Sequence, residues 1–187
     1  MKNILKLLLL SSFLINLSAG LFGPLYAVFV EQIGGDLLTA GLAFAVFSIV
    51  SGVLIYIFGK WEDRIKHQEN ILIISRFLTV LGTIGYLLIQ SPAHLFAVQI
   101  VFGISSALIT PAFDSMYSKN LTKGKYASQW GAWESMYAIT VGIAAIIGGY
   151  LAQTYGFKTL FIVMVILAIF SFITTLLLRK DIRRMIK

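Results

Sequence analysis

The segment GKWEDRIKHQ, residues 59–68, decides the fold, because it stands between two long apolar runs. It carries six ionisable side chains in a chain of 187 residues of which 12% are charged and 58% are hydrophobic. In soluble domains about a quarter of the residues are charged. The composition therefore indicates an integral membrane protein. In such a protein a short charged segment is expected at the membrane surface, between two spanning helices.

Six apolar runs are long enough to cross a ~30 Å hydrocarbon core as helices, which takes about 20 residues each. Polar and turn-forming segments separate them, so we expect an all-α membrane fold in one domain, residues 1–187. The start of the first run is similar to a signal peptide, but its apolarity continues through Val30, which is too long for one. The expected helices are residues 4–30, 37–59, 71–90, 94–117, 127–153 and 157–178.

The basic residues predict the orientation. An even number of crossings returns both termini to one side, and every Lys and Arg except Arg76 and Lys158 lies near the termini, in residues 59–68 or in residues 119–125. By the positive-inside rule we expect both termini and the charged loop in the cytoplasm, in a multi-pass protein of the cell membrane. The net charge of +7 has the same explanation, so the bilayer is an expected partner and nucleic acid is not.

The sequence offers no catalytic or metal-binding pattern. The chain has no cysteine and two histidines, too few for a thiolate site or a histidine cluster. It has no nucleotide-binding glycine loop and no Ser/His/Asp arrangement. We therefore expect no metal, no cofactor and no enzymatic activity.

Three residues of the charged segment, Gly59, Asp63 and Arg64, resemble the G-x-x-x-D-R core of the signature loop of the major facilitator superfamily. The stretch TVGIAAIIGGY, residues 140–150, is similar to the glycine-rich fifth helix of that family. Residues 101–131 resemble its fourth helix and the loop beyond it. Members have two six-helix halves, so the resemblance implies a transporter fold of which this chain resembles one half, the amino-terminal one.

Departures from the family pattern are also visible. Lys66 stands where the signature loop has a second glycine, and Gln99 stands where proton-coupled exporters have a buried arginine. Ala144 and Ala145 replace the glycine-proline step of antiporters. These departures argue against drug/proton antiport.

In the family, the loop aspartate is thought to interact with the start of a helix in the other half. The equivalent here is the fifth helix of a second copy, so the resemblance implies that Asp63 docks on a partner subunit across a two-fold axis. Otherwise the loop is a solvated topology anchor. Small residues recur on the second and fifth helices, either as a homodimer interface or for packing within one bundle. The interface candidates are Gly41, Ala45, Gly52, Gly142 and Gly149.

Ionisable residues inside the spans are costly unless they are paired or wet. Arg76 and Asp114 lie at similar depth on neighbouring helices, so we expect a buried charge pair. Glu134 either binds a proton or a cationic group, or forms a hydrogen bond within its own bundle. In the family the first and fourth helices line the pathway. With aromatic residues of the fifth helix, the cavity candidates are Asn16, Tyr26, Gln99, Ser106, Thr110, Trp133, Glu134 and Tyr137.

Together these patterns predict a half-size secondary transporter of a small solute that works by alternating access as a homodimer. Two other functions are compatible with the same residues. One is a non-transporting membrane scaffold or accessory subunit. The other is a half that pairs with a separately encoded partner half.

Overall fold

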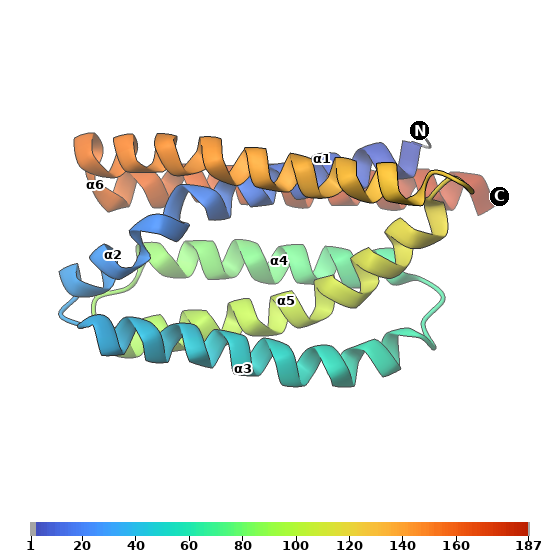
Figure 1. Ribbon diagram of the computed structural model, residues 1–187. Coiled ribbons are helices and arrows are strands. Elements are labelled where there is room, and N and C mark those ends of the chain that lie inside the picture. The colour runs from blue at the N-terminus through green and yellow to red at the C-terminus, as the bar shows by residue number, and fades with distance from the viewer. Residues whose placement is uncertain (1–2, 187) are drawn as a thin grey trace.

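The computed structural model describes residues 3–186, with the side chains of residues 4–180. Met1, Lys2 and Lys187, which the expected domain includes, lie outside the described residues. The described chain is a bundle of long helices (Figure 1). Its elements are α1 (Asn3–Phe22), η1 (Gly23–Leu25), α2 (Tyr26–Gln32), α3 (Leu37–Glu62), α4 (Gln68–Leu87), α5 (Pro92–Asn120) and α6 (Tyr126–Ile186).

Within the described residues, five helical segments are long and apolar enough to cross a bilayer. The fifth, Tyr126–Lys180, has 55 residues, which at 1.5 Å per residue is more than twice the hydrocarbon thickness. It is not one straight helix, because Gly156 has φ 80° and ψ 168°, a backbone conformation that only glycine adopts readily. The chain folds back there, and the two arms of α6, before and after Gly156, run side by side (Figure 1).

The first membrane segment is also interrupted. The single helix expected over residues 4–30 is instead α1 and α2 joined by the 3₁₀ turn η1. Pro24 lies in this turn, lacks a backbone N–H, and cannot continue the hydrogen-bond ladder of α1. Pro111, in contrast, lies inside α5 without interrupting it.

The charged segment is more helical than expected. Helix α3 continues to Glu62 rather than ending at Gly59, and α4 begins at Gln68 rather than at Ile71. The connection is therefore the short turn of residues 63–67. It is closed by a hydrogen bond from the Ile65 N–H to the Glu62 carbonyl.

The helices pack in two groups joined by α4. Helix α1 packs mainly on α6, α3 packs on α5, and α4 contacts both α5 and α6. The two ends of the described chain lie at the same end of the bundle as residues 63–67 and 121–125 (Figure 1). Residues 33–36, residues 88–91 and the fold-back at Gly156 lie at the other end.

The α1–α6 contact is especially close. A Cβ atom on Gly148 would overlap the carbonyl group of Leu21, and one on Gly20 would lie 2.8 Å from the Cβ of Ala144. Hydroxyl groups add a polar seam, in which Ser11 Oγ lies 2.7 Å from Thr175 Oγ1. This contact fixes α1 beside the recess described next.

Candidate solute recess

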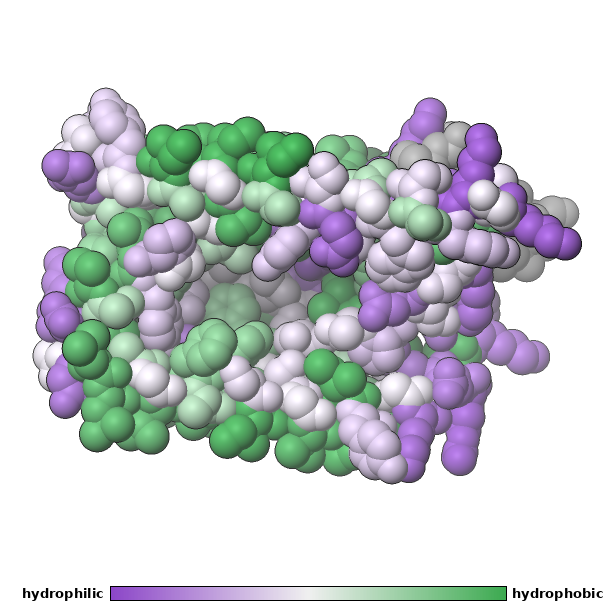
Figure 2. Space-filling model, in the orientation of Figure 1, coloured by the Kyte–Doolittle hydropathy of each residue, from purple (hydrophilic) through white to green (hydrophobic). Residues whose placement is uncertain are grey.

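Two adjoining hollows lie between α1, α4, α5 and α6. The larger is about 600 Å³ and the smaller about 240 Å³. They are parts of one space, which we call the central recess, because they share Ile15, Asn16, Arg76, Ile109 and Thr110. In Figure 2 the viewed face is hollowed between the layer formed by α6 and the layer formed by α3.

Helix α4 provides a polar face to the larger hollow. The side chains that line it are those of Arg76, Thr79, Thr83 and Tyr86, at spacings of three, four and three residues. Residues three and four apart lie on the same side of a helix. Sequence reasoning missed this lining apart from Arg76, although the spacing was visible in the sequence.

Arg76 is 7% exposed and lines both hollows. Its Nη2 donates a long hydrogen bond of 3.4 Å to Ser12 Oγ, while its Nε is buried without a partner among the described residues. The expected charge pair with Asp114 is not formed. The nearest contact of this kind among the described side chains joins His67 Nδ1 and Glu69 Oε1, at 3.0 Å, and it is an ion pair when the histidine is protonated. Asp114 borders the smaller hollow but is exposed rather than buried, because α5 turns it toward the open edge.

Asn16 of α1 also lines both hollows, and its Nδ2 is buried with no hydrogen-bond partner in the described chain. Thr110 and Ser106 of α5 face the same space, although both hydroxyls are engaged. Thr110 Oγ1 donates to the Ser106 carbonyl at 2.8 Å, and Ser51 Oγ donates to Ser106 Oγ at 3.0 Å. The free amide of Asn16 is therefore a stronger ligand candidate than these hydroxyls.

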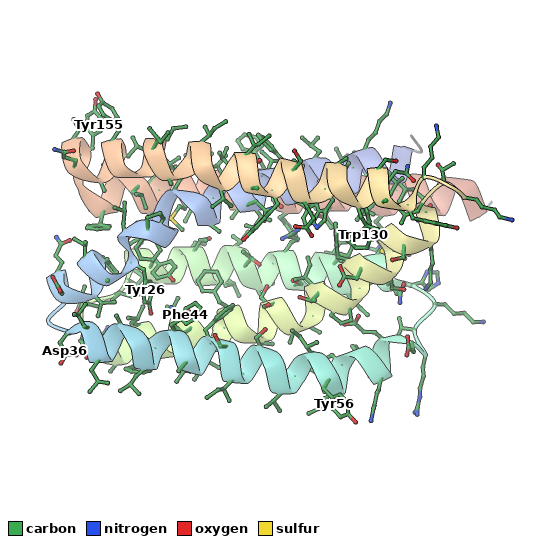
Figure 3. All side chains as sticks on the ribbon, in the orientation of Figure 1. Tyr26, Asp36, Phe44, Tyr56, Trp130 and Tyr155 are labelled. Atoms are coloured by element: carbon green, nitrogen blue, oxygen red, sulfur yellow. The ribbon has the colours of Figure 1, made fainter. Side chains whose placement is uncertain are left out.

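Tyr26 and Gln99 border a further hollow of about 310 Å³, which shares Phe47 and Phe102 with the larger one. Gln99 Nε2 donates to the Tyr26 hydroxyl at 2.8 Å. Figure 3 shows Tyr26 lying between the ribbons of α2 and α3. This hydrogen bond positions both side chains at the recess, and it leaves the Tyr26 hydroxyl proton and the Gln99 Oε1 without a hydrogen-bond partner among the described residues.

The candidates on α6 are divided. Tyr137 lines the larger hollow and Trp133 the smaller, where its ring packs 4.8 Å from that of Phe113. Glu134 lines neither, and is exposed on α6 near enough to Asp114 for their charges to interact. In a single copy of the chain Glu134 thus lies outside the recess.

An aromatic layer lies between the recess and the end of the bundle at Gly156. Phe22, Phe29, Tyr86 and Phe161 are buried, and the rings of Phe22 and Tyr86 are 4.9 Å apart. Tyr86 lines both the larger hollow and an outer hollow of about 770 Å³ that reaches Gly156. The layer therefore separates the recess from the outer hollow at this end.

The signature-loop residues lie at the opposite end. Gly59 is on α3, where an added Cβ would lie 3.9 Å from Pro111, while Asp63 and Arg64 are exposed in the turn. Their neighbour Glu62, which sequence reasoning did not single out, is 1% exposed. Both of its carboxylate oxygens are buried without hydrogen-bond partners among the described groups.

The interface candidates face open space. A Cβ added to Gly41, Gly52, Gly142 or Gly149 would have no atom of the described residues within 4 Å, and Ala45 is half-buried. These glycines lie on α3 and the first arm of α6. They are not used for close packing within this bundle.

These features define a helical multi-pass membrane protein with an internal polar recess. A sequence profile of the Major Facilitator Superfamily matches residues 8–185, so the chain belongs to this superfamily, which is a family of transporters rather than of enzymes. The resemblance carried by Gly59, Asp63, Arg64 and the glycine-rich fifth-helix stretch is confirmed.

The individual relatives share about a quarter of their aligned residues with this chain. An uncharacterized MFS-type transporter of Methanocaldococcus jannaschii is 27% identical over 173 residues, which are 92% of this chain and 45% of that protein. The multidrug resistance protein MdtG of Rahnella sp. is 25% identical over 170 residues, 88% of this chain and 40% of that one. This chain therefore spans less than half the length of these relatives.

A solved structure shares the fold. The POT family transporter PepTSo superposes with a TM-score of 0.72 over 96% of this chain and 38% of its own, at 16% sequence identity. At that identity the likeness shows the architecture alone.

Proposed function

We propose that this chain is one six-helix half of a secondary transporter for a small solute, and that a second copy supplies the other half. Both arms of α6 then cross the membrane. The turns at residues 63–67 and 121–125 carry basic residues and lie at the same end as both described chain ends. By the positive-inside rule that end faces the cytoplasm.

The observation that carries the proposal is the open glycine face beside the recess. Gly41, Gly52, Gly142 and Gly149 have no packing partner in the bundle, whereas glycines on membrane helices usually permit close approach of another helix. A two-fold axis would set α3 and the first arm of α6 of one copy against the same two elements of its partner. The two recesses would then form one central space, which rocking of the copies could open to either side.

The partner at this face is either a second copy of this chain or a separately encoded half. A third alternative, a non-transporting scaffold, would not need the polar recess. Native mass spectrometry of the purified protein separates the first two cases, because self-pairing gives a mass of two identical chains. Uptake into liposomes across a panel of solutes, with and without a pH gradient, separates transport from a scaffold role. Uptake of no solute by protein reconstituted as a folded dimer would contradict the transporter proposal.

In this arrangement Asp63 holds the cytoplasmic ends of the two copies together. It is exposed just after α3, and the start of the partner's α6, with Lys125 and Ser128, would present N–H groups and positive charge to it. Such a contact exists only when these ends are close, so it favours the state closed to the cytoplasm.

The chain contains no cysteine, so one introduced at Thr110, in the recess, reports access from the cytoplasm. Asp63→Asn should raise the rate of labelling at that position. The matched control, Asp36→Asn at the other end of α3, should leave it unchanged. Equal labelling rates in the Asp63 variant and the parent would contradict the proposed contact between Asp63 and the partner.

Glu134 is the candidate for proton coupling. In the two-fold dimer the exposed Glu134 carboxyls of both copies would face the same central space, where they could bind a proton or a cationic group. Glu134→Gln should abolish any dependence of uptake on a pH gradient while leaving dimerisation intact. Unaltered coupling in that variant would assign Glu134 a structural role.

A further inference from the structure

Arg76 is the one cationic side chain among the described residues that line the central recess, and none of the described side chains neutralises it. Its side chain is 93% buried, since 7% of its surface is exposed. No carboxylate of the described residues lies within ion-pairing distance of it. An unpaired buried charge in the hydrocarbon region costs several kcal/mol, so such an arginine is expected to face a partner or a ligand.

The guanidinium group retains unused donors. An arginine offers five N–H donors, and here the hydrogen bond to a side chain is the long one from Nη2 to Ser12 Oγ, while Nε is buried without a partner among the described residues. A planar guanidinium matches a carboxylate or a phosphate, which can accept two parallel hydrogen bonds.

Asn16 supplies a second unpartnered donor. Asn16 Nδ2 is buried and unpartnered, and Asn16 lines both hollows together with Arg76. Two residues from different helices, α1 and α4, therefore line one space and each keeps a donor without a partner among the described residues. Asp114, the carboxylate at this lining, is exposed at the edge of the smaller hollow, so the larger hollow has positive charge and no negative charge in its lining.

The remaining walls are largely aromatic and apolar. Phe22, Phe47, Phe102 and Tyr137 line the larger hollow, which at about 600 Å³ is large enough for a small organic molecule. An apolar body with one charged end would satisfy both kinds of lining.

We propose that the solute of the central recess is a small organic anion, whose carboxylate or phosphate group is held by Arg76 and Asn16 while its apolar part packs on the phenylalanine rings. That the ligand is a transported solute rests on the proposed function, but binding of the anion itself requires no transport. It also accounts for the absence of an Arg76–Asp114 pair, since the arginine is kept for the ligand.

The direct test is binding of tritium-labelled benzoate to the purified full chain in lipid nanodiscs at pH 7.5, with unlabelled benzamide and benzylamine as competitors. Benzoate should bind, and neither the neutral amide nor the cationic amine should displace it. Arg76→Gln should weaken binding about tenfold to a hundredfold, the range for a hydrogen bond to a charged group. Arg76→Lys should have an intermediate effect, because lysine keeps the positive charge but lacks the planar guanidinium that donates two parallel hydrogen bonds.

Asn16→Ala supplies a variant that leaves the arginine in place, and it should weaken benzoate binding about twofold to tenfold. Asp114→Asn is the control for a hidden charge pair and should leave binding equal or tighter. No saturable benzoate binding, equal binding of benzamide, or unchanged benzoate affinity in Arg76→Gln would each overturn the inference.

The two proposals fail differently. Uptake of a neutral or cationic solute that is unaffected by Arg76→Gln would overturn the anion site and leave the transporter proposal standing. Benzoate binding that depends on Arg76, in a protein that transports nothing, would do the reverse.

Discussion

The two sides of the first arm of α6 differ sharply. On one side Gly148 meets the carbonyl of Leu21, so closely that no other residue fits. On the other side its neighbour Gly149, with Gly142 about two turns before it, has open space around it among the described residues. Small residues let membrane helices approach closely. One glycine surface packs against α1, and the other has no neighbouring atom among the described residues.

Helix α3 extends the open side. In the most apolar stretch of α3, 11% of the residues are buried, whereas in the most apolar stretch of α6 the buried share is 39%. If only lipid contacted this face of α3, leucine would serve there as well as glycine. The glycines of α3 are therefore consistent with the proposed pairing.

The largest effect is expected on the side of the first arm of α6 that packs against α1, which we call the closed side. Gly148→Leu should destabilise the bundle by more than about 3 kcal/mol, because the added atoms meet backbone that cannot rotate away. Unfolding titration with a denaturing detergent measures it. The matched control is Gly149→Leu, which should keep the stability of the single bundle within about 0.5 kcal/mol. Equal losses in both variants would mean that the two sides do not differ.

A smaller loss is expected in the polar seam of the closed side. Ser11 Oγ lies 3.2 Å from Ser171 Oγ and 2.7 Å from Thr175 Oγ1. Ser11→Ala should cost about 0.6 to 2 kcal/mol, the range for hydrogen bonds between membrane helices. The same unfolding titration checks it against Ser48→Ala on the exposed face of α3, where we expect no change. A Ser11 variant as stable as the parent would show that the hydroxyl contributes nothing to the contact.

On the open side the effect should fall on association instead. Gly52→Leu or Gly142→Leu should weaken the dimer about tenfold, because a larger side chain keeps the helices apart, while the stability of each bundle is retained. Dilution in lipid with energy transfer between labelled copies gives the dissociation constant. The variant Val28→Leu, exposed on α2 away from this face, serves as the control. Unchanged association of both glycine variants would place the interface elsewhere.

The smallest effect concerns the start of α3. The Thr39 hydroxyl and backbone N–H both donate to Asp36, at 2.6 and 2.7 Å, and these bonds lower the pKa of the Asp36 carboxyl. A lowered pKa means that the cap stabilises the fold above the carboxyl's unfolded pKa, and that this is lost as the pH falls through the lowered value. Wild-type stability should thus decline slightly below about pH 4.

Asp36→Asn retains the cap oxygen but does not titrate, so the difference in stability between it and the wild type should narrow as the pH falls. Thermal unfolding at stepped pH measures that difference. A difference that stays constant between pH 3 and pH 7 would remove Asp36 as its source.

The sequence predicted much of this architecture, because apolar length and the signature-loop residues are local signals. It could not tell which of Gly148 and Gly149 is buried, since adjacent residues differ by about 100° around a helix and only the neighbouring helix decides. The break at Pro24 needed its tertiary context too, because Pro111 leaves α5 continuous.

The recess was predicted in part. The candidates that line it are Asn16, Ser106, Thr110, Trp133 and Tyr137. The described side chains form no Arg76–Asp114 ion pair, because similar depth in the membrane does not fix the rotation of two helices about their axes. The polar face of α4 could have been found from its three-four-three spacing alone.

The central claim is that the open face pairs with a second copy, and the most direct measurement is the number of chains per particle in lipid nanodiscs, determined by native mass spectrometry over a range of protein to lipid ratios. The account predicts two chains per particle, with disulfide cross-linking between copies when Gly52→Cys and Gly142→Cys are combined in this cysteine-free chain. A protein that remains a single chain at every ratio, and yet takes up solute in liposomes, would contradict it.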